Sequence, residues 1–453
     1  MKKLVAGAAV AALLGSAAFA DVNVGLSGQN VWAIGNGVNA NGDSANDVKM
    51  ANATNWGGDG TRNQISVEAS NDNFGGKFAY NHNGDSDTAI DCGFLWYSPF
   101  EQLKIWAGKG TGDDIRGDAC YSTWELFRVG TMRQAEGKNN AFHEAFTFQG
   151  QDSTGAKIGV FPIEGLKIFA SLEYPGWNNM SATTYYDEDG EELDSADLLN
   201  GKYWDSTDNT WKEATKKTTT TNLAEILGRK SKYAIAYSIG GDDGIATIKV
   251  GLDTNPDRVY VKDGDEKKVK DQNIINAAVD LRPMDNLFIS VGAFIPTVQK
   301  YYILDNSSEE QSIGNKVNLY GKFGATDELN IHAQVGTKIG TYKTGDKSDD
   351  YKKDGQLGLF FAAGVDYKLM EDLTLFGDVG YANGIYMSNS VADHKDCLNF
   401  GLGIQKSYDA CSVSAGFVGA TNGYGMYKTT YTDNGDTKYP FSWGIPLRVS
   451  YSF

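Results

Sequence analysis

The chain has 453 residues, a formal net charge of −17 at pH 7 and a hydrophobic content of 41%. This acidic balance argues against nucleic-acid binding, because affinity for a phosphate backbone comes from clustered lysine and arginine. Glycine (54 residues) and tyrosine (24) are abundant and proline (8) is scarce, a composition that suits many long strands joined by turns.

Residues 1–20 have the features of a secretory signal peptide. The segment begins with two lysines, continues as a short apolar run and ends in small residues at Ala18 and Ala20. Cleavage after Ala20 would leave residues 21–453 as a single mature domain. After residue 20 there is no uninterrupted apolar run of about 18 residues, so a membrane-embedded form of this chain would have to be a closed β-barrel.

A turn-and-strand unit recurs along the chain. Each copy ends one strand, passes through acidic residues or glycine, and opens a new strand of alternating apolar and polar residues. Turn residues between runs of period two predict β-hairpins. The eight short turns lie within 70–76, 100–105, 161–168, 239–245, 281–289, 323–331, 369–375 and 406–411.

Longer, polar connections lie between these hairpins. Eight turns and nine long connections would join eighteen antiparallel strands, with sixteen as the alternative if the first strand or segment 82–97 is misread. Short turns at one end and long connections at the other are typical of transmembrane β-barrels, so the predicted fold class is all-β. The long connections are expected at 34–60, 82–88, 110–140, 175–230, 254–272, 296–315, 340–355, 384–396 and 421–439.

The C-terminal stretch 441–453 has an apolar residue at every odd position, which places those side chains on one face of a strand. Arg448 points to the other face, which must therefore be wet. An amphipathic edge strand of a soluble sandwich is the alternative. With its terminal Phe453, the stretch resembles the closing strand of a Gram-negative outer-membrane porin, where Val449, Tyr451 and Phe453 would form the assembly signal.

The resemblance covers the whole chain and carries several implications. It places the long connections outside the cell and the short turns in the periplasm. It also implies contact with outer-membrane lipid and lipopolysaccharide-like lipids, recognition by the barrel assembly machinery, and a homotrimer. The expected function is a water-filled channel for passive diffusion of ions and small hydrophilic solutes.

The charged residues expected on the inner wall are mostly basic, although the chain as a whole is acidic. A basic lumen would favour small anions. The alternative is that each lysine pairs with a carboxylate on a neighbouring strand. The predicted pore-lining basic residues are Lys77, Lys104, Lys157, Lys167, Lys249, Arg282, Lys322, Lys368 and Arg448; the inward acids are Glu68, Glu173, Asp280, Asp366 and Asp378.

Connection 110–140 is the third long one, and in general porins the equivalent loop folds into the barrel as a constriction. This resemblance rests on position and composition alone. A solvated surface loop is the alternative. The candidate constriction residues are Asp113, Asp114, Arg116, Asp118, Glu125 and Arg128.

Four cysteines are present, and an exported chain can oxidise them. Their spacing favours Cys92–Cys120 and Cys397–Cys411 among the three ways of pairing four cysteines, with reduced thiols as the alternative. A Cys92–Cys120 bridge would tie connection 110–140 to the barrel wall. Cys397 is expected near an outer strand end and Cys411 near a turn, which counts against the second pair.

Connection 175–230 is the longest, and loops of that length usually cover a pore mouth or meet partners. Its acidic start at 187–190 lacks the ligand spacing of a calcium loop. No nucleophile or metal motif occurs elsewhere, so no enzyme, metal or cofactor is expected.

Two other functions stay open. One is a substrate-selective channel for sugars or organic acids, for which a continuous aromatic path along the lumen would be evidence; the inward rings are Trp106, Phe169, Phe288, Phe294, Tyr320 and Phe376. The other is a surface adhesin or structural barrel with a plugged lumen, whose binding would be carried by connection 175–230.

Overall fold

The structure is a computed structural model, and the described residues belong mainly to strands and short turns. The expected signal peptide lies outside them. Among the described residues no helix is long and apolar enough to cross a membrane. The described ranges are 21–36, 48–52, 61–83, 86–110, 115–116, 147–148, 154–173, 181–188, 192–193, 201–205, 207–208, 210–220, 231–241, 244–254, 258–262, 265–269, 273–297, 301–302, 310–311, 315–344, 352–383, 396–422, 431–433, 436–438 and 441–453.

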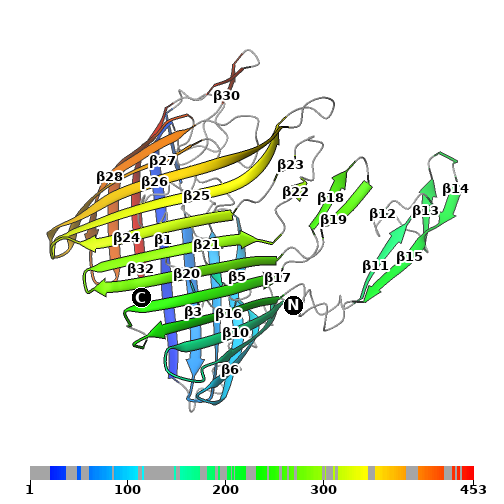
Figure 1. The fold of residues 1–453 in the computed structure, drawn as a ribbon, viewed down its shortest axis with the longest axis horizontal. Coiled ribbons are helices and arrows are strands. Elements are labelled where there is room, and N and C mark those ends of the chain that lie inside the picture. The colour runs from blue at the N-terminus through cyan, green and yellow to red at the C-terminus, as the bar shows by residue number, and fades with distance from the viewer. Residues whose placement is uncertain are drawn as a thin grey trace.

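The main sheet contains nineteen strands, all paired antiparallel within the described residues (Figure 1). Eighteen of them form a closed ring, and the short strand β2 (Lys49–Asn52) pairs only with the end of β1. The ring consists of β1 (Asp21–Gly35), β3 (Thr61–Ser70), β4 (Phe74–Asn83), β5 (Ser86–Phe100), β6 (Leu103–Lys109), β9 (Thr154–Val160), β10 (Leu166–Glu173), β16 (Ser231–Ile239), β17 (Ala246–Thr254), β20 (Asn273–Met284), β21 (Leu287–Pro296), β24 (Asn315–Gly324), β25 (Leu329–Thr344), β26 (Lys352–Met370), β27 (Leu373–Ala382), β28 (Cys397–Ser407), β29 (Cys411–Ala420) and β32 (Ser442–Ser452).

The first and last strands close the ring. Strand β1 pairs with β32 on one side, from Ser27 opposite Ser452 to Gly35 opposite Gly444. The terminal residue Phe453 adds two backbone hydrogen bonds, donating to Leu26 O at 2.8 Å and accepting from Leu26 N at 3.1 Å. Each of the eighteen strands of the ring is paired on both sides, which a barrel in lipid requires.

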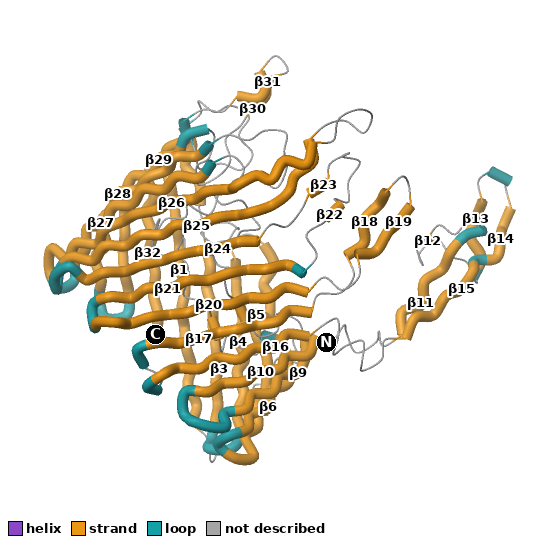
Figure 2. Tube along the Cα trace, in the orientation of Figure 1, coloured by secondary structure: helices purple, strands orange, loops and turns teal. Residues whose placement is uncertain are grey.

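All eight predicted short turns join consecutive strands of the ring, and they gather at one end of the barrel (Figure 2). Side chains fix two of them. Asn71 Oδ1 accepts hydrogen bonds from the backbone N–H of Asn73 and Phe74, both at 2.9 Å, and Thr326 Oγ1 accepts from Glu328 and Leu329, both at 3.1 Å. These local side-chain bonds are what Asn and Thr supply at turns.

The long connections leave the strands at the opposite end, and two of them are shorter than the sequence suggested. Segment 82–88 was expected to be a long connection, but β4 and β5 stay paired as far as Asn83 opposite Ser86. Segment 340–355 was expected to be irregular, but β25 and β26 stay paired as far as Thr344 opposite Lys352. Four of the other connections carry a pair of short strands of their own: β7 (Ile115–Arg116) with β8 (Thr147–Phe148), β18 (Arg258–Lys262) with β19 (Asp265–Val269), β22 (Tyr301–Tyr302) with β23 (Glu310–Gln311), and β30 (Tyr431–Asp433) with β31 (Asp436–Lys438).

The two faces of the ring differ as the alternation predicts. On β25, Ile331, Ala333 and Val335 are exposed on the outside, whereas His332 and Gln334 are buried on the inside. Each of the eighteen strands presents at least one large exposed apolar side chain outward. An apolar belt that surrounds the whole molecule is stable against lipid and unfavourable in water.

Candidate functional site

The inner wall of the barrel is the first candidate site. All nine predicted pore-lining basic residues fall on the inward face, because each shares its parity along the strand with buried neighbours. Their side chains differ in solvent exposure. Lys157 and Lys249 are buried, so neither lines an open pore, whereas Arg282, Lys322 and Lys368 are exposed. The remaining four, Lys77, Lys104, Lys167 and Arg448, are half-buried.

Lys249 is neutralised inside the wall. Its Nζ lies 2.5 Å from Asp280 Oδ2, and Asp280 also accepts a hydrogen bond from Ser290. All three side chains are almost completely buried. This group spans the adjacent strands β17, β20 and β21, and it confirms cross-strand pairing for one of the predicted basic residues.

Lys157 lies against aromatic rings. Its Nζ is 4.2 Å from the centroid of the Trp106 ring and 5.7 Å from that of Phe169, and the side chain has no exposed surface. Both rings pack over Gly159, where an added Cβ would lie 2.8 Å from Phe169 and 3.0 Å from Trp106. The small inward residues Ala234, Ala236 and Ala278 complete this apolar cluster. It is wall packing around a cation–π contact.

The inward rings of the described wall lie on several different strands. Trp106 and Phe169, with centroids 6.2 Å apart, belong to the cluster on β6 and β10. Phe288 and Tyr320, with centroids 6.0 Å apart, lie on β21 and β24, and Phe376 packs against Gly403 on β28. Trp106, Phe169, Phe294, Tyr320 and Phe376 are all buried.

A chain of polar side chains crosses β24, β25 and β26. His332 Nδ1 lies 3.3 Å from the Tyr320 hydroxyl, and His332 Nε2 lies 3.1 Å from Asp366 Oδ2. The imidazole and the phenol are buried, and the carboxylate of Asp366 is largely covered. In the sequence, the alternation of Leu329, Ile331 and Ala333 with polar residues indicates an inward His332, but it does not indicate these partners.

The three exposed basic side chains occupy one sector of the wall near the short turns. Arg282, Lys322 and Lys368 each lie two residues before the end of β20, β24 and β26, respectively. None of them makes an ion pair with a described residue. By contrast, Lys77 lies 3.8 Å from Glu68. These three side chains therefore contribute positive charge to the inner wall that no described carboxylate neutralises by an ion pair.

The predicted constriction residues are mostly outside the described residues. Arg116 lies in β7, where it pairs with Thr147, and Asp113, Asp114, Asp118, Glu125 and Arg128 are not described. Cys120 is not described either, so the Cys92–Cys120 pairing stays a prediction.

The predicted Cys397–Cys411 disulfide is wrong. Both residues have free thiols, with Cys397 at the long-connection end of β28 and Cys411 at the turn end of β29. Ten residues of β28 separate Cys397 from Ser407, which pairs with Ser412 beside Cys411. At about 3.3 Å per residue the two thiols are held far beyond bonding distance.

The predicted assembly residues lie at the ring closure. Val449 and Tyr451 alternate outward on β32, and Phe453 is exposed at its end. The Tyr451 hydroxyl donates a hydrogen bond to Asn63 Oδ1 on β3, reaching across β1. Their role in assembly stays a prediction.

A second candidate site lies in connection 175–230. Its described strands pair only with one another: β11 (Ser181–Tyr186) lies between β12 (Glu192–Leu193) and β15 (Thr215–Thr220), and β13 (Lys202–Asp205) forms a hairpin with β14 (Thr210–Glu213). We call residues 181–220 the loop module. Figure 1 shows its strands beyond β10 and β16, coloured green to cyan.

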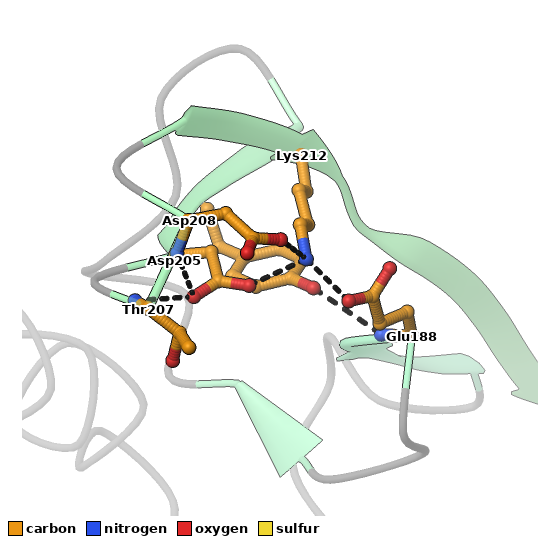
Figure 3. Close-up of polar contacts among 6 residues, drawn as sticks. Glu188, Asp205, Thr207, Asp208 and Lys212 are labelled. Atoms are coloured by element: carbon orange, nitrogen blue, oxygen red, sulfur yellow. Dashed lines mark hydrogen bonds and ion pairs between the residues drawn. The ribbon is translucent and has the colours of Figure 1, made fainter.

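Lys212 forms the centre of an ion-pair group in the loop module (Figure 3). Its Nζ lies 2.6 Å from Asp205 Oδ2, 2.6 Å from Asp208 Oδ2 and also contacts Glu188. Asp205 Oδ1 accepts from the backbone N–H of Thr207 at 2.7 Å. These hydrogen bonds, Lys212 first, lower the pKa of Asp205 to about 2, and the three carboxylates raise the pKa of Lys212.

The three carboxylates of Glu188, Asp205 and Asp208 could by themselves hold a metal ion. The ammonium of Lys212 lies among them, at the position that a cation would take. The group is therefore satisfied internally and joins the hairpin β13–β14 to the segment that follows β11. The sequence analysis missed it, although the Asp205-Ser-Thr-Asp-Asn-Thr210 stretch between two tryptophans is a hairpin-turn signal.

Comparisons with known proteins show distant structural similarity. No protein-family model matches the chain, and no curated protein matches it. Among solved structures, the anion-selective porin from Comamonas acidovorans covers 96% of this chain and 100% of its own, with 10% identity and a TM-score of 0.44. A mutant of the Rh. blastica porin gives the same coverage, 12% identity and a TM-score of 0.41.

A third structure, the outer-membrane expressed OmpT of Vibrio cholerae, gives 11% identity and a TM-score of 0.39 over 96% of this chain and 98% of its own. Similarities this distant do not carry a functional assignment. The strand pairing itself shows that the chain forms a closed antiparallel barrel of eighteen strands, with the porin-type architecture that the sequence resembles.

Proposed function

We propose that this protein is an outer-membrane channel through which ions and small hydrophilic solutes diffuse passively. The observation that supports it most is the contrast between the two faces of the closed ring. Large apolar side chains are exposed outward on every strand, and polar or charged side chains alternate with them inward. A ring with those faces is stable in a bilayer and encloses a polar interior. In this proposal the short turns face the periplasm.

The proposed path is narrower than the circumference of the ring suggests. The inward side chains of Asn318 and Gln334, in the middle of the wall, and of Asn399, near its long-connection end, are almost fully buried. The exposed basic sector of Arg282, Lys322 and Lys368 is open near the short turns. We therefore expect a modest conductance with a preference for anions, because positive charge in a narrow polar passage concentrates anions there.

The test is single-channel conductance of the refolded mature protein in a planar bilayer, with the reversal potential measured under a salt gradient. Steady steps with an anion-selective reversal potential would support the proposal. The proposal would be overturned if the barrel is correctly closed, as verified by its heat-modifiable mobility on a gel, and yet conducts no current. Homotrimer formation, which the resemblance implies, can be read from the number of simultaneous steps and from the mass in mild detergent.

A surface-binding barrel is the second candidate function, and a specific observation favours it. The middle of the inner wall is buried, and the loop module has a folded structure of its own that is fixed by the Lys212 group. A barrel that serves as an anchor needs only those two features. The absence of conductance together with retained ligand binding by the loop module would select this candidate.

A further inference from the structure

We propose that the exposed indole pair Trp204 and Trp211 in the loop module is a binding surface for an uncharged saccharide. This inference is independent of whether the barrel conducts. It follows from the way in which the two faces of hairpin β13–β14 are used, from the exposure of the rings and from the charge around them.

The two faces of the hairpin have different environments. Residues directly opposite each other in an antiparallel pair lie on the same face. Tyr203 is opposite Lys212, and both point to the inner face, where Tyr203 is buried. The Tyr203 hydroxyl accepts a hydrogen bond from the backbone N–H of Glu188 at 3.3 Å. With the Lys212 ion pairs, this contact holds the inner face against the segment that follows β11 (Figure 3).

The outer face carries the tryptophans. Trp204 is opposite Trp211, with ring centroids 5.5 Å apart and planes at 67°. The next pair outward on the same face is Lys202 and Glu213, whose charged groups are 2.9 Å apart. Trp204 is 48% exposed and Trp211 is 47% exposed. A rigid aromatic surface therefore has a polar donor and a polar acceptor at its border.

Structural stabilisation of the hairpin does not account for all of this surface. An edge-to-face aromatic pair adds stability beyond burial, which favours the hairpin. The same pair leaves about half of two large apolar rings in water, and exposed aromatic surface on a fixed support is characteristic of binding sites. The rings of a partner-binding surface must be held still before binding, and the Lys212 group does this from the other face.

The charge of the loop module limits the partner. Residues 181–220 contain ten acidic and four basic residues. A polyanion, such as an acidic glycan or an anionic lipid surface, would be repelled. An uncharged sugar ring has an apolar C–H face that packs flat on an indole and hydroxyls at its edge that can bond Lys202 and Glu213. Indole faces with a polar border are complementary to such a ring.

The experiment uses the full refolded protein in a detergent without a sugar headgroup, so that the micelle does not compete. Neutral hexasaccharides of glucose, mannose and N-acetylglucosamine are titrated while tryptophan fluorescence and calorimetric heat are followed. Sulfated and sialylated oligosaccharides are titrated in parallel. We expect a saturable response to at least one neutral oligosaccharide and none to the anionic ones.

Two variants assign the response to this surface. Trp204→Ala with Trp211→Ala should weaken binding by about tenfold or more, a loss of about 1.4 kcal/mol. Trp204→Phe with Trp211→Phe keeps a ring at each position and should retain partial binding with the hairpin intact. The matched control is Tyr408→Ala, which removes an exposed ring from a short turn at the other end of the barrel and should change nothing.

Any one of four results would overturn the proposal. One is that no neutral saccharide gives a response at concentrations up to about 10 mM, a range that would still reveal a dissociation constant of about 10 mM. Another is saccharide binding that persists in the double alanine variant. The third is a response to the anionic oligosaccharides equal to that to the neutral ones, and the fourth is a polypeptide ligand that alone requires the two tryptophans.

Discussion

The guanidinium carbon of Arg282 lies 5.0 Å from the centroid of the Phe288 ring, on the adjacent strand of the barrel wall. The contact holds a positive charge at the inner face near the short turns. Phe288 in turn lies opposite Lys322 on the next strand, so the ring separates two exposed cations. With Lys368, these side chains form the sector that we expect to set ion preference.

Reversing the charge of this sector should reverse the selectivity. In the triple variant Arg282→Glu, Lys322→Glu and Lys368→Glu, the field at the short-turn end of the passage becomes negative and cations are concentrated instead. The reversal potential under a salt gradient should move toward the cation side. Lys406→Gln is the control, because Lys406 lies on the outward face and pairs with Asp372. An unchanged reversal potential in the triple variant would place the selectivity elsewhere.

Breaking the buried pair of Lys249 and Asp280 should destabilise the barrel. Lys249→Met leaves the carboxylate of Asp280 buried beside Ser290 without its cation, at a cost of about 3–5 kcal/mol. Urea unfolding in micelles, followed by the heat-modifiable gel shift, measures this loss. Adding Asp280→Leu removes the buried charge and should restore most of the stability. A single variant as stable as the wild type would show that the carboxylate reaches water or another cation.

Gly159 should tolerate no side chain, because the rings of Phe169 and Trp106 lie over it. Gly159→Ala forces both rings of the wall cluster to shift, and we expect a loss of about 1–3 kcal/mol. Gly321→Ala is the matched control, since the nearest atom to its added Cβ is Phe288 O at 3.9 Å. Denaturant midpoints of the two variants should therefore differ; equal midpoints would mean that the rings move freely.

The loop module should lose stability in acid. The pKa of Asp205 is lowered from 3.8 to about 2 in the folded state, mainly by its hydrogen bond from Lys212. A lowered pKa contributes stability above the unfolded value, and this contribution is lost as the pH falls from about 3.8 toward 2. Amide hydrogen exchange of residues 201–213 should therefore accelerate across that range.

Lys212→Met removes the main cause of the lowered pKa and should flatten the pH dependence of that exchange. The exciton circular dichroism of Trp204 and Trp211 gives a second reading, since it depends on their closeness. If the Lys212→Met variant and the wild type respond identically to acid, the Lys212 group is not what holds the hairpin.

The strand order and the direction of each face were predictable from local patterns. The turn at 323–331, for example, contains Thr326 and a run of acidic residues between two alternating segments, and both its position and the inward direction of His332 are confirmed. Turn chemistry and period-two alternation are properties of a few consecutive residues, so the sequence contains them directly. Segment 340–355 was misjudged because β25 and β26 extend their pairing through polar residues without an apolar face.

The state of the individual charges was not predictable in the same way. Lys157, Lys249 and Lys322 look alike in the sequence as inward lysines on alternating strands. Only the register of neighbouring strands covers Lys157 with the rings of Trp106 and Phe169, pairs Lys249 with Asp280 and leaves Lys322 open. Likewise, the Lys212 group requires carboxylates up to 24 residues away in the chain.

The sequence by itself therefore determined the barrel, its turn-bearing end and the side of the wall on which each residue lies, because these depend on local periodicity and turn formation. The tertiary structure decided which inward charges stay exposed, that Cys397 and Cys411 cannot meet, and that Trp204 and Trp211 form one exposed surface. Burial, pairing and exposure are set by residues that strand register brings together from distant parts of the chain, and no local pattern encodes those neighbours.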